Sequence, residues 1–207
     1  QALAKGARDL GAKIFRFTPA IGVTQKNDKT WTVHTEKGDI NCQYVVNAAG
    51  YYAQQVGEWF KPYGGRTVPM MVMSHQYLLS EEIPEIENYA KKSGKKLPLL
   101  RDVDISYYLR QEKNGFNLGP YEPNCKAHWA TEDDPMPDDF SFQLWNDDLD
   151  RIEDIVADAM ERVPLLGTSG VSRVINGPIP YAPDGLPLIG PMPGVENGFE
   201  ACVFTFG

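Results

Sequence analysis

A histidine, a pair of tyrosines and an arginine in the middle of the sequence are the side chains best suited to acid–base or ion-pair chemistry. His75 lies in an apolar, strand-like run, and an imidazole can exchange a proton near pH 7. Tyr107 and Tyr108 are adjacent, so on a strand one faces a core and the other can offer its hydroxyl to a ligand. Arg110 would share the face of Tyr108, where its guanidinium can hold a carboxylate through two parallel hydrogen bonds. The competing interpretations are a structural histidine and a surface salt bridge, both of which are common.

Small residues at the end of a second apolar run indicate a different kind of site. Ala48, Ala49 and Gly50 follow the run that starts at Tyr44 and precede a predicted helix. A ligand can approach the backbone closely at such a place, and the free N–H groups of the helix favour an anion such as a pyrophosphate. Close packing of the strand against the helix explains the same small residues equally well.

Other motifs are less specific. The Gly- and Pro-rich segment 183–191 is rigid enough to shape a pocket wall, although surface turns account for most such clusters. The acidic run 132–139 reads as a solvated loop. The histidines and the three cysteines lack metal-ligand spacing, so we predict no metal site. The sequence also has no Gly-x-Ser-x-Gly motif and no Gly-rich phosphate loop.

The elements that must position these residues follow from their periodicity. In the first sixty residues we expect a helix at 1–10, a strand at 12–17, a three-stranded meander at 21–42, a buried strand at 44–50 and a helix at 52–60. Later we expect strands at 70–79, 105–111 and 115–119, a surface excursion to residue 96, a helix at 149–163 and a final strand from residue 200. These patterns predict an α/β part intertwined with a mainly antiparallel sheet.

Composition excludes several classes of partner. The 207 residues carry 20 Lys and Arg against 28 Asp and Glu, a net charge of −8, which argues against binding nucleic acid. No apolar run reaches the roughly 18 residues of a membrane helix, so we expect no membrane association. The odd number of widely spaced cysteines favours a reducing compartment rather than secretion. The first residue is Gln1 and the last residues form a strand-like run, from which we expect a piece of a longer protein.

Several motifs, in order along nearly the whole chain, resemble one family of flavoproteins. Gly11-Ala12-Lys13-Ile14, Thr18-Pro19 and Val45-Val46-Asn47-Ala48-Ala49-Gly50 resemble the second half of the FAD-binding domain of the D-amino-acid-oxidase superfamily. His75-Gln76-Tyr77, Leu99-Leu100-Arg101-Asp102, Tyr107 to Glu112, Gly119-Pro120-Tyr121-Glu122 and Pro183 to Pro191 are similar to its dimethylglycine and sarcosine dehydrogenase branch.

The resemblance implies a fold and an activity. The fold is α/β (α+β), with a partial Rossmann-like FAD-binding domain at 1–66 and 176–207 intertwined with a substrate-binding domain at 67–175. The activity is oxidation of an N-methyl amino acid by hydride transfer to FAD, which gives an iminium and then formaldehyde or methylene-tetrahydrofolate. The implied partners are an electron-transfer flavoprotein and, in a downstream domain, tetrahydrofolate. The location would be the cytoplasm in a bacterium or the mitochondrial matrix in a eukaryote. The alternative is a non-catalytic regulatory or binding subunit with the same fold, as in one relative that serves a phosphatase.

The resemblance also assigns roles to individual residues. The implied catalytic residues are His75 and a tyrosine of the pair Tyr107 and Tyr108, of which we favour Tyr108, and Arg110 would bind substrate. The implied cofactor-binding residues are Ala20, Ala48, Ala49, Gly50, Thr205, Phe206 and Gly207. Two features depart from the family pattern. Val203 stands where relatives commonly have glycine, and the family's N-terminal Gly-rich loop is absent, so we do not expect these residues alone to bind FAD tightly.

Overall fold

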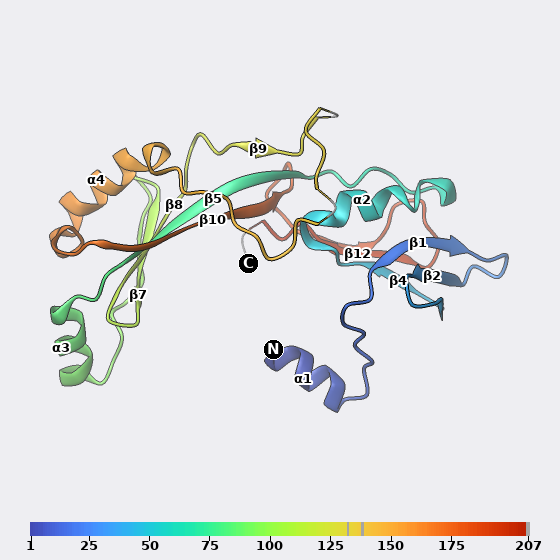
Figure 1. Ribbon diagram of the computed structural model, residues 1–207, viewed down its shortest axis with the longest axis horizontal. Coiled ribbons are helices and arrows are strands. Elements are labelled where there is room, and N and C mark those ends of the chain that lie inside the picture. Colours follow the sequence, from blue (N-terminus) through green and yellow to red (C-terminus); the bar gives the residue numbers. More distant parts are fainter. Residues whose placement is uncertain (132, 138, 206–207) are drawn as a thin grey trace. The chain divides into compact units, whose positions relative to one another are not determined.

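A computed structural model of the chain describes residues 1–131, 133–137 and 139–205 (Figure 1). It divides into two compact units: unit 1 comprises Gln1–Met70 and Ala182–Gly207, and unit 2 comprises Met71–Tyr181. We expected these boundaries at 66/67 and 175/176. They lie further along the chain because two long strands, β5 and β10, run without interruption to Met71 and Tyr181.

Unit 1 contains two small sheets. The first is an antiparallel meander of β1 (Ala20–Gln25), β2 (Trp31–Thr35) and β3 (Ile40–Cys42). In the second, β12 (Gly198–Cys202) lies between β4 (Val45–Asn47), to which it is parallel, and β11 (Leu188–Pro191), to which it is antiparallel. The helices of this unit are α1 (Ala2–Asp9), α2 (Ala53–Glu58) and the short 3-10 turns η1 (Gly50–Tyr52) and η2 (Lys61–Tyr63).

The core of unit 1 joins residues from both ends of the sequence. One cluster consists of Ala53, Val68, Ala182, Cys202 and Val203, and a second consists of Trp31, Phe60, Met192 and Val195. The ring of Trp31 packs edge-on against those of Phe60 and Tyr63. Burial of these rings explains why strands near residue 200 pair with a strand near residue 46.

The strand predicted at 12–17 is wrong. No described residue pairs with this segment, and Phe17 has a left-handed backbone with φ of 53°, which interrupts an extended chain. Phe15 and Phe17 are 62% and 79% exposed. Alternation of side chains is therefore insufficient here, because a strand also needs a neighbour for its backbone N–H and C=O groups.

Unit 2 is built on one antiparallel sheet of six strands. Their order is β10 (Val171–Tyr181), β5 (Met71–Ser80), β8 (Gly115–Pro120), β7 (Tyr107–Glu112) and β6 (Leu100–Asp102), with β9 (Ala127–His128) also paired to β5. The helical segments are α3 (Pro84–Ser93), η3 (Leu149–Arg151), α4 (Glu153–Arg162) and η4 (Pro164–Thr168). The mixed α/β class and the mainly antiparallel sheet agree with the prediction.

The excursion predicted before residue 96 contains a helix. Pro84 occupies the first turn of α3, and Gly94 ends it with a left-handed φ of 65°. Both are ordinary helix boundaries, with proline at the start and glycine past the end. Ile86 anchors the helix in the core of unit 2.

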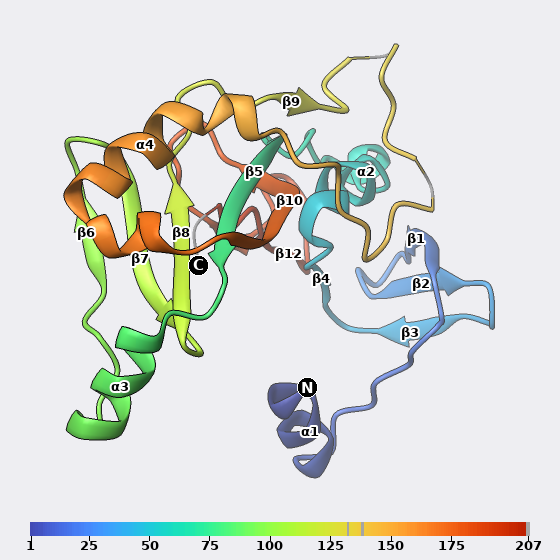
Figure 2. The ribbon, with the colours of Figure 1, turned by 60° about the vertical axis from the view of Figure 1, so that its left-hand side comes forward.

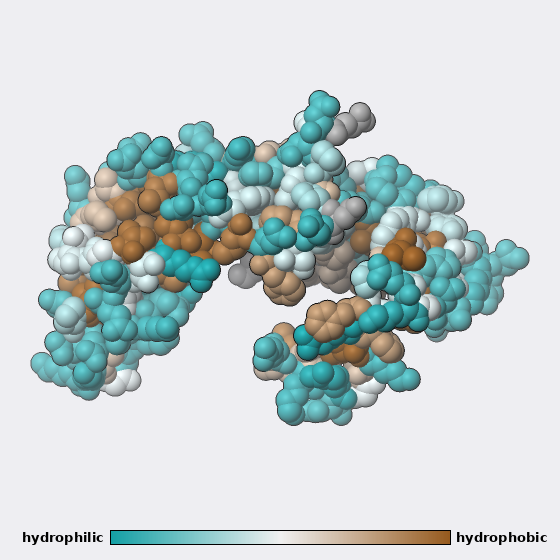
Figure 3. Space-filling view, viewed as in Figure 1, coloured by the Kyte–Doolittle hydropathy of each residue, from teal (hydrophilic) through white to brown (hydrophobic). Residues whose placement is uncertain are grey.

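Helix α4 covers one face of the sheet in unit 2 (Figure 2). Ala159 of α4 belongs to the same buried cluster as Tyr107, Leu109 and Leu118 of β7 and β8. Beside α4, an apolar groove of about 390 Å³ is lined by residues such as Leu78, Val156 and Val171, and apolar side chains are visible on the surface there (Figure 3). The opposite face, which we call the site face, carries His75, Tyr77, Tyr108, Arg110, Asn117 and Gly119, by the alternation along β5, β7 and β8.

Candidate functional site

The two adjacent tyrosines lie on opposite sides of the sheet. Tyr107 is fully buried in the cluster under α4, and its hydroxyl has no hydrogen-bond partner among the described residues. Tyr108 is half-buried on the site face, two residues before Arg110 on the same strand. We therefore exclude Tyr107 from the proposed site and keep Tyr108 in it.

The ring of Tyr108 lies on the backbone of the neighbouring strand. Tyr108 pairs with Gly119, and a Cβ atom at position 119 would fall 2.1 Å from the ring, so only glycine leaves room for it there. Tyr121 packs edge-on at 6.0 Å between ring centroids. Burial raises the pKa of Tyr108, Arg110 opposes this rise, and Tyr121 and Tyr77 add to it. The Tyr108 hydroxyl is thus protonated near neutral pH and able to donate a hydrogen bond.

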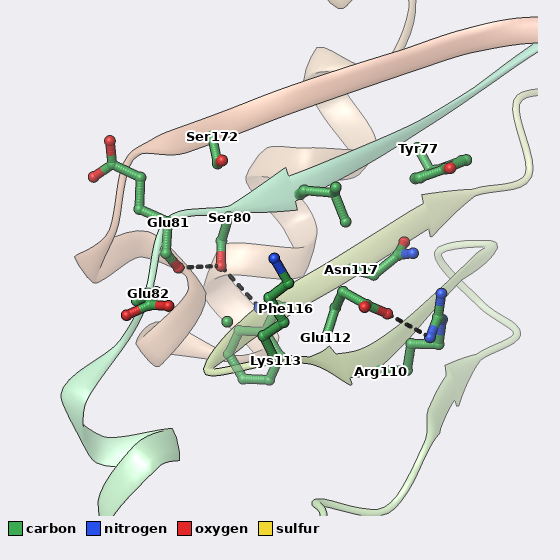
Figure 4. Close-up of a pocket in the computed structure, with 12 residues that line it drawn as sticks. Tyr77, Ser80, Glu81, Glu82, Arg110, Glu112, Lys113, Phe116, Asn117 and Ser172 are labelled. Atoms are coloured by element: carbon green, nitrogen blue, oxygen red, sulfur yellow. Dashed lines mark hydrogen bonds and ion pairs between the residues drawn. The ribbon is translucent and has the colours of Figure 1, made fainter.

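Arg110 lies at a cavity of about 390 Å³ on the site face (Figure 4). Its Nη1 atom is 2.8 Å from Oε2 of Glu112, and both side chains are close to half exposed. Tyr77 and the buried amide of Asn117 line the same cavity. The salt bridge that we considered as the competing interpretation is present, so a substrate carboxylate would have to compete with Glu112 for the guanidinium.

The strand that pairs with β5 changes beside His75. On one side of β5, Leu78 pairs with Leu118 of β8, whereas Val72 pairs with His128 of β9. Between these points the backbone N–H of Gln76 donates to the Glu122 carboxylate at 2.8 Å instead of to a strand. The partner of β5 at Gln76 is therefore a side chain and not a strand.

The imidazole of His75 is favoured in its neutral form. Its side chain is only 10% exposed, and burial lowers its pKa, with a further contribution from the positive charge of Arg151. A neutral imidazole can accept a proton at neutral pH. The structure thus brings His75, Tyr108 and Arg110 to one face of one sheet.

Sequence reasoning missed other polar residues around this face. They are Tyr77, Tyr121, Tyr181, Glu122 and Arg151. Tyr77 could have been found, because it alternates with His75 along the predicted strand. Tyr181 lies near Glu122 and Tyr121. Its pKa is raised to about 12, mainly by burial and next by the neighbouring Cys125. Nothing in the sequence indicated that Arg151 lies near His75, because Arg151 falls in a predicted helix far along the chain.

Three of the predicted cofactor-binding residues share a groove in unit 1. Ala20, Ala48 and Ala49 line an apolar groove of about 350 Å³ together with residues such as Val23 and Trp59. The amide of Asn47 fixes the turn after β4 by donating to the carbonyl of Ala53 at 2.8 Å and accepting from the N–H of Ala49 at 3.3 Å. The small side chains leave the backbone accessible, which fits contact with an apolar or sugar portion of FAD.

Four further residues were predicted to bind the cofactor. Gly50 has a left-handed φ of 61°, which gives glycine a local conformational reason at this position. Thr205 is buried, and its hydroxyl accepts a hydrogen bond from the N–H of Ala182 at 3.3 Å. Phe206 and Gly207 lie outside the described residues. Val203 has a φ of 57°, a conformation suited to the glycine that we expected in relatives.

The described residues lack two further features. No three His, Cys, Asp or Glu side chains of that part of the chain are grouped as metal ligands. None of its helices has the length and apolar character of a membrane-spanning segment.

Comparison with protein families gives a match over almost the whole chain. The model of the family described as FAD dependent oxidoreductase (DAO) matches residues 1–205. This chain belongs to the FAD-dependent oxidoreductase family. The crystal structure of L-proline dehydrogenase from P. horikoshii shares its fold, with a TM-score of 0.72 and 21% identity over 99% of this chain and 48% of that one.

Relatives of this FAD-dependent oxidoreductase chain include two mitochondrial dehydrogenases. Mouse dimethylglycine dehydrogenase is 40% identical over 100% of this chain and 23% of its own length, and mouse sarcosine dehydrogenase is 31% identical over 98% and 21%. The mouse pyruvate dehydrogenase phosphatase regulatory subunit is 28% identical over 96% of this chain and 21% of its own length. The chain thus spans about a quarter of the length of these relatives.

Proposed function

We propose that the protein containing this chain is an FAD-dependent oxidoreductase that oxidises an N-methyl amino acid resembling dimethylglycine or sarcosine. One observation carries the proposal. A chain 40% identical to dimethylglycine dehydrogenase places a neutral histidine, a protonated tyrosine and an arginine, His75, Tyr108 and Arg110, on one sheet face. An imidazole, a phenol and a guanidinium are groups that can recognise the amine and the carboxylate of an amino acid. Of the three residues, Arg110 is the one that lines the cavity of Figure 4.

Each of these residues has a distinct proposed role. Arg110 binds the substrate carboxylate, which must be recognised locally because the chain as a whole has a net charge of −8. Neutral His75 accepts a proton from the substrate ammonium, which frees the nitrogen lone pair. Tyr108 donates a hydrogen bond that orients the amine.

We propose that unit 1 contributes to holding FAD through Ala20, Ala48, Ala49, Gly50, Thr205, Phe206 and Gly207. When bound, FAD supplies the acceptor for a hydride from the carbon next to nitrogen. We further propose hydrolysis of the resulting substrate iminium to formaldehyde or its capture by tetrahydrofolate, an electron-transfer flavoprotein as partner, and a mitochondrial matrix location in a eukaryote.

The test is a visible absorption spectrum of the full-length protein, recorded before and after anaerobic addition of sarcosine and then dimethylglycine. We expect flavin bands that bleach on addition, and a His75→Gln variant that keeps the bands but bleaches more slowly. Bands that persist with both compounds would contradict the substrate assignment. A purified protein without flavin bands would instead favour a non-catalytic regulatory subunit, the function named for the phosphatase relative.

A further inference from the structure

A buried ion pair lies directly behind His75. The Oε2 atom of Glu122 is 2.5 Å from Nε of Arg151, and the two side chains are 0% and 10% exposed. Removing both charges from water is costly, so the pair is a weak source of stability. The contacts of the two side chains are with Ser74, Gln76 and Asp148 and with His75 itself, so we assign the pair an effect through His75.

The pair ties two segments of unit 2 to the residues that flank His75. Oε1 of Glu122 accepts the backbone N–H of Gln76 at 2.8 Å and lies 3.5 Å from Nδ1 of His75. On the other side, Nη1 of Arg151 donates to the hydroxyl of Ser74 at 2.7 Å. Both neighbours of His75 in the chain are thus held by this pair.

A second contact fixes the segment that carries Arg151. The side chain of Gln76 accepts the backbone N–H of Asp148 and donates to the carbonyl of Asp148, each at 2.8 Å. This double hydrogen bond holds the start of η3 against β5. The position of Arg151 relative to His75 is therefore determined by the backbone of both elements.

The remaining titratable groups around the pair are Tyr121, Cys125, His128, Asp148 and Tyr181. Burial raises the pKa of Cys125 and Tyr181, so both are neutral near pH 7. Burial lowers the pKa of His128, which is therefore neutral as well. Asp148 lies 3.8 Å from Nη1 of Arg151 and is about half exposed. Opposite His75 on β10 is Gly177, which has no side chain to titrate.

We propose that Glu122 and Arg151 are positioning residues that hold the His75 imidazole in its orientation and balance the charge that it experiences. Burial raises the pKa of Glu122, whereas the N–H of Gln76 and the charge of Arg151 oppose that rise and favour the carboxylate. This carboxylate lies 3.5 Å from Nδ1 of His75. This positioning role rests on the proposed function in one respect, which is that the substrate ammonium gives His75 its proton. The balance of charges on His75 can be measured without substrate.

The proposal predicts opposite effects for the two members of the pair. Arg151→Met leaves the Glu122 carboxylate unopposed beside Nδ1, so the protonated form of His75 gains stability and its pKa rises. Glu122→Gln leaves the Arg151 charge unopposed, so the pKa of His75 falls. A charge within about 4–6 Å shifts a pKa by one to three units, so we expect at least a tenfold change in the protonation constant.

The pKa of His75 is measured by NMR titration of the full-length protein labelled with ¹³C-histidine, with the His75 signal assigned by its loss in His75→Gln. Arg151→Lys, which keeps the charge, should leave the pKa close to that of the wild type. Arg162→Met is the matched control. Arg162 is 56% exposed and 3.9 Å from Asp102, so its removal should change nothing at His75.

A merely structural role gives a different result. If the variants only loosened the site, both would move the pKa of His75 upward toward its ordinary value, and an upward shift or no shift in Glu122→Gln would overturn the proposal. Should Arg151→Met not fold, the near-isosteric Glu122→Gln decides the question alone. The acidic limb of the flavin-bleaching rate should follow the same shifts. NMR shifts without bleaching would uphold the positioning role and contradict the proposed substrate.

Discussion

At the residue scale, the adjacent tyrosines form a matched pair for mutation. Tyr108→Phe removes a hydroxyl from the site face and should slow flavin bleaching by about 100-fold, the size of an acid–base or orienting contribution. Tyr107→Phe removes a buried hydroxyl that has no partner among the described residues, and should leave the rate unchanged. It should also leave the free energy of unfolding unchanged or raise it by up to about 1 kcal/mol.

Rapid mixing under anaerobic conditions gives the rates, and urea unfolding gives the free energies. A slow Tyr107→Phe variant of normal stability would show that the proposed site lies on the wrong face of the sheet. Equal rates for Tyr108→Phe and the wild type would remove Tyr108 from the site.

Arg110 and Glu112 provide a second residue-scale prediction. Because their ion pair competes with a substrate carboxylate, Arg110→Gln should weaken substrate binding about tenfold, whereas Glu112→Gln should strengthen it a few-fold. Titration of flavin absorbance with a non-reactive carboxylate inhibitor measures both dissociation constants. Weaker binding in Glu112→Gln would mean that Glu112 itself contacts the ligand.

The sequence predicted part of this site. Strand alternation was enough to place Tyr108 and Arg110 on one face, because side-chain direction repeats every two residues. It could not reveal that Glu122 replaces a strand partner at Gln76, because this contact depends on where β8 diverges from β5. Arg151 was equally out of reach, since a helix periodicity says nothing about which strand lies behind it.

At the element scale, Gly119 explains how β8 supports Tyr108. Gly119→Ala would place a methyl group 2.1 Å from atoms of the Tyr108 ring, so the ring must move. We expect a loss of about 1–3 kcal/mol in the free energy of unfolding, as in overpacked cores, and slower bleaching.

The matched control is Gly22→Ala in β1. An added Cβ there has its nearest neighbour, Cδ2 of His34, at 4.0 Å. This variant should retain the stability and the rate of the wild type. Wild-type behaviour of Gly119→Ala would show that the Tyr108 ring does not lie where the structure has it.

Elements with strong periodicity were predicted correctly in type, whereas those that depend on a partner were not. The strands β5 and β7 were found because their alternation reflects two differently buried faces. Strand β8 is buried at every position and was found from the hairpin turn before it. Residues 12–17 alternate as well but have no pairing partner in the described chain, and α3 was hidden by its many charged residues. Tertiary context decides such cases.

At the scale of the whole molecule, the two units should differ in their ability to fold alone. Unit 2 is continuous and has its own core around Leu118 and Ala159, so a fragment of residues 71–181 should show β-rich circular dichroism and cooperative urea unfolding. A fragment of residues 1–70 should not, because Trp31 and Phe60 pack on Met192 and Val195. Cooperative unfolding of the second fragment, or its absence in the first, would contradict the division into units.

Family membership could be predicted from the sequence because ordered motifs span nearly the whole chain. The domain boundaries at 66/67 and 175/176 stay predictions, and the compact units divide after Met70 and Tyr181, where β5 begins and β10 ends. Local patterns reflect the burial of a segment. They do not reveal which core buries it.

The pairing of β5 with β10 joins Met71 to Tyr181, the residues at which the chain enters and leaves unit 2. The two ends of unit 2 are therefore neighbours on one ladder. Insertions are best tolerated where their ends meet. Unit 2 could therefore be exchanged as one piece, because replacing residues 71–181 by the corresponding segment of a relative would require only two adjacent splice points.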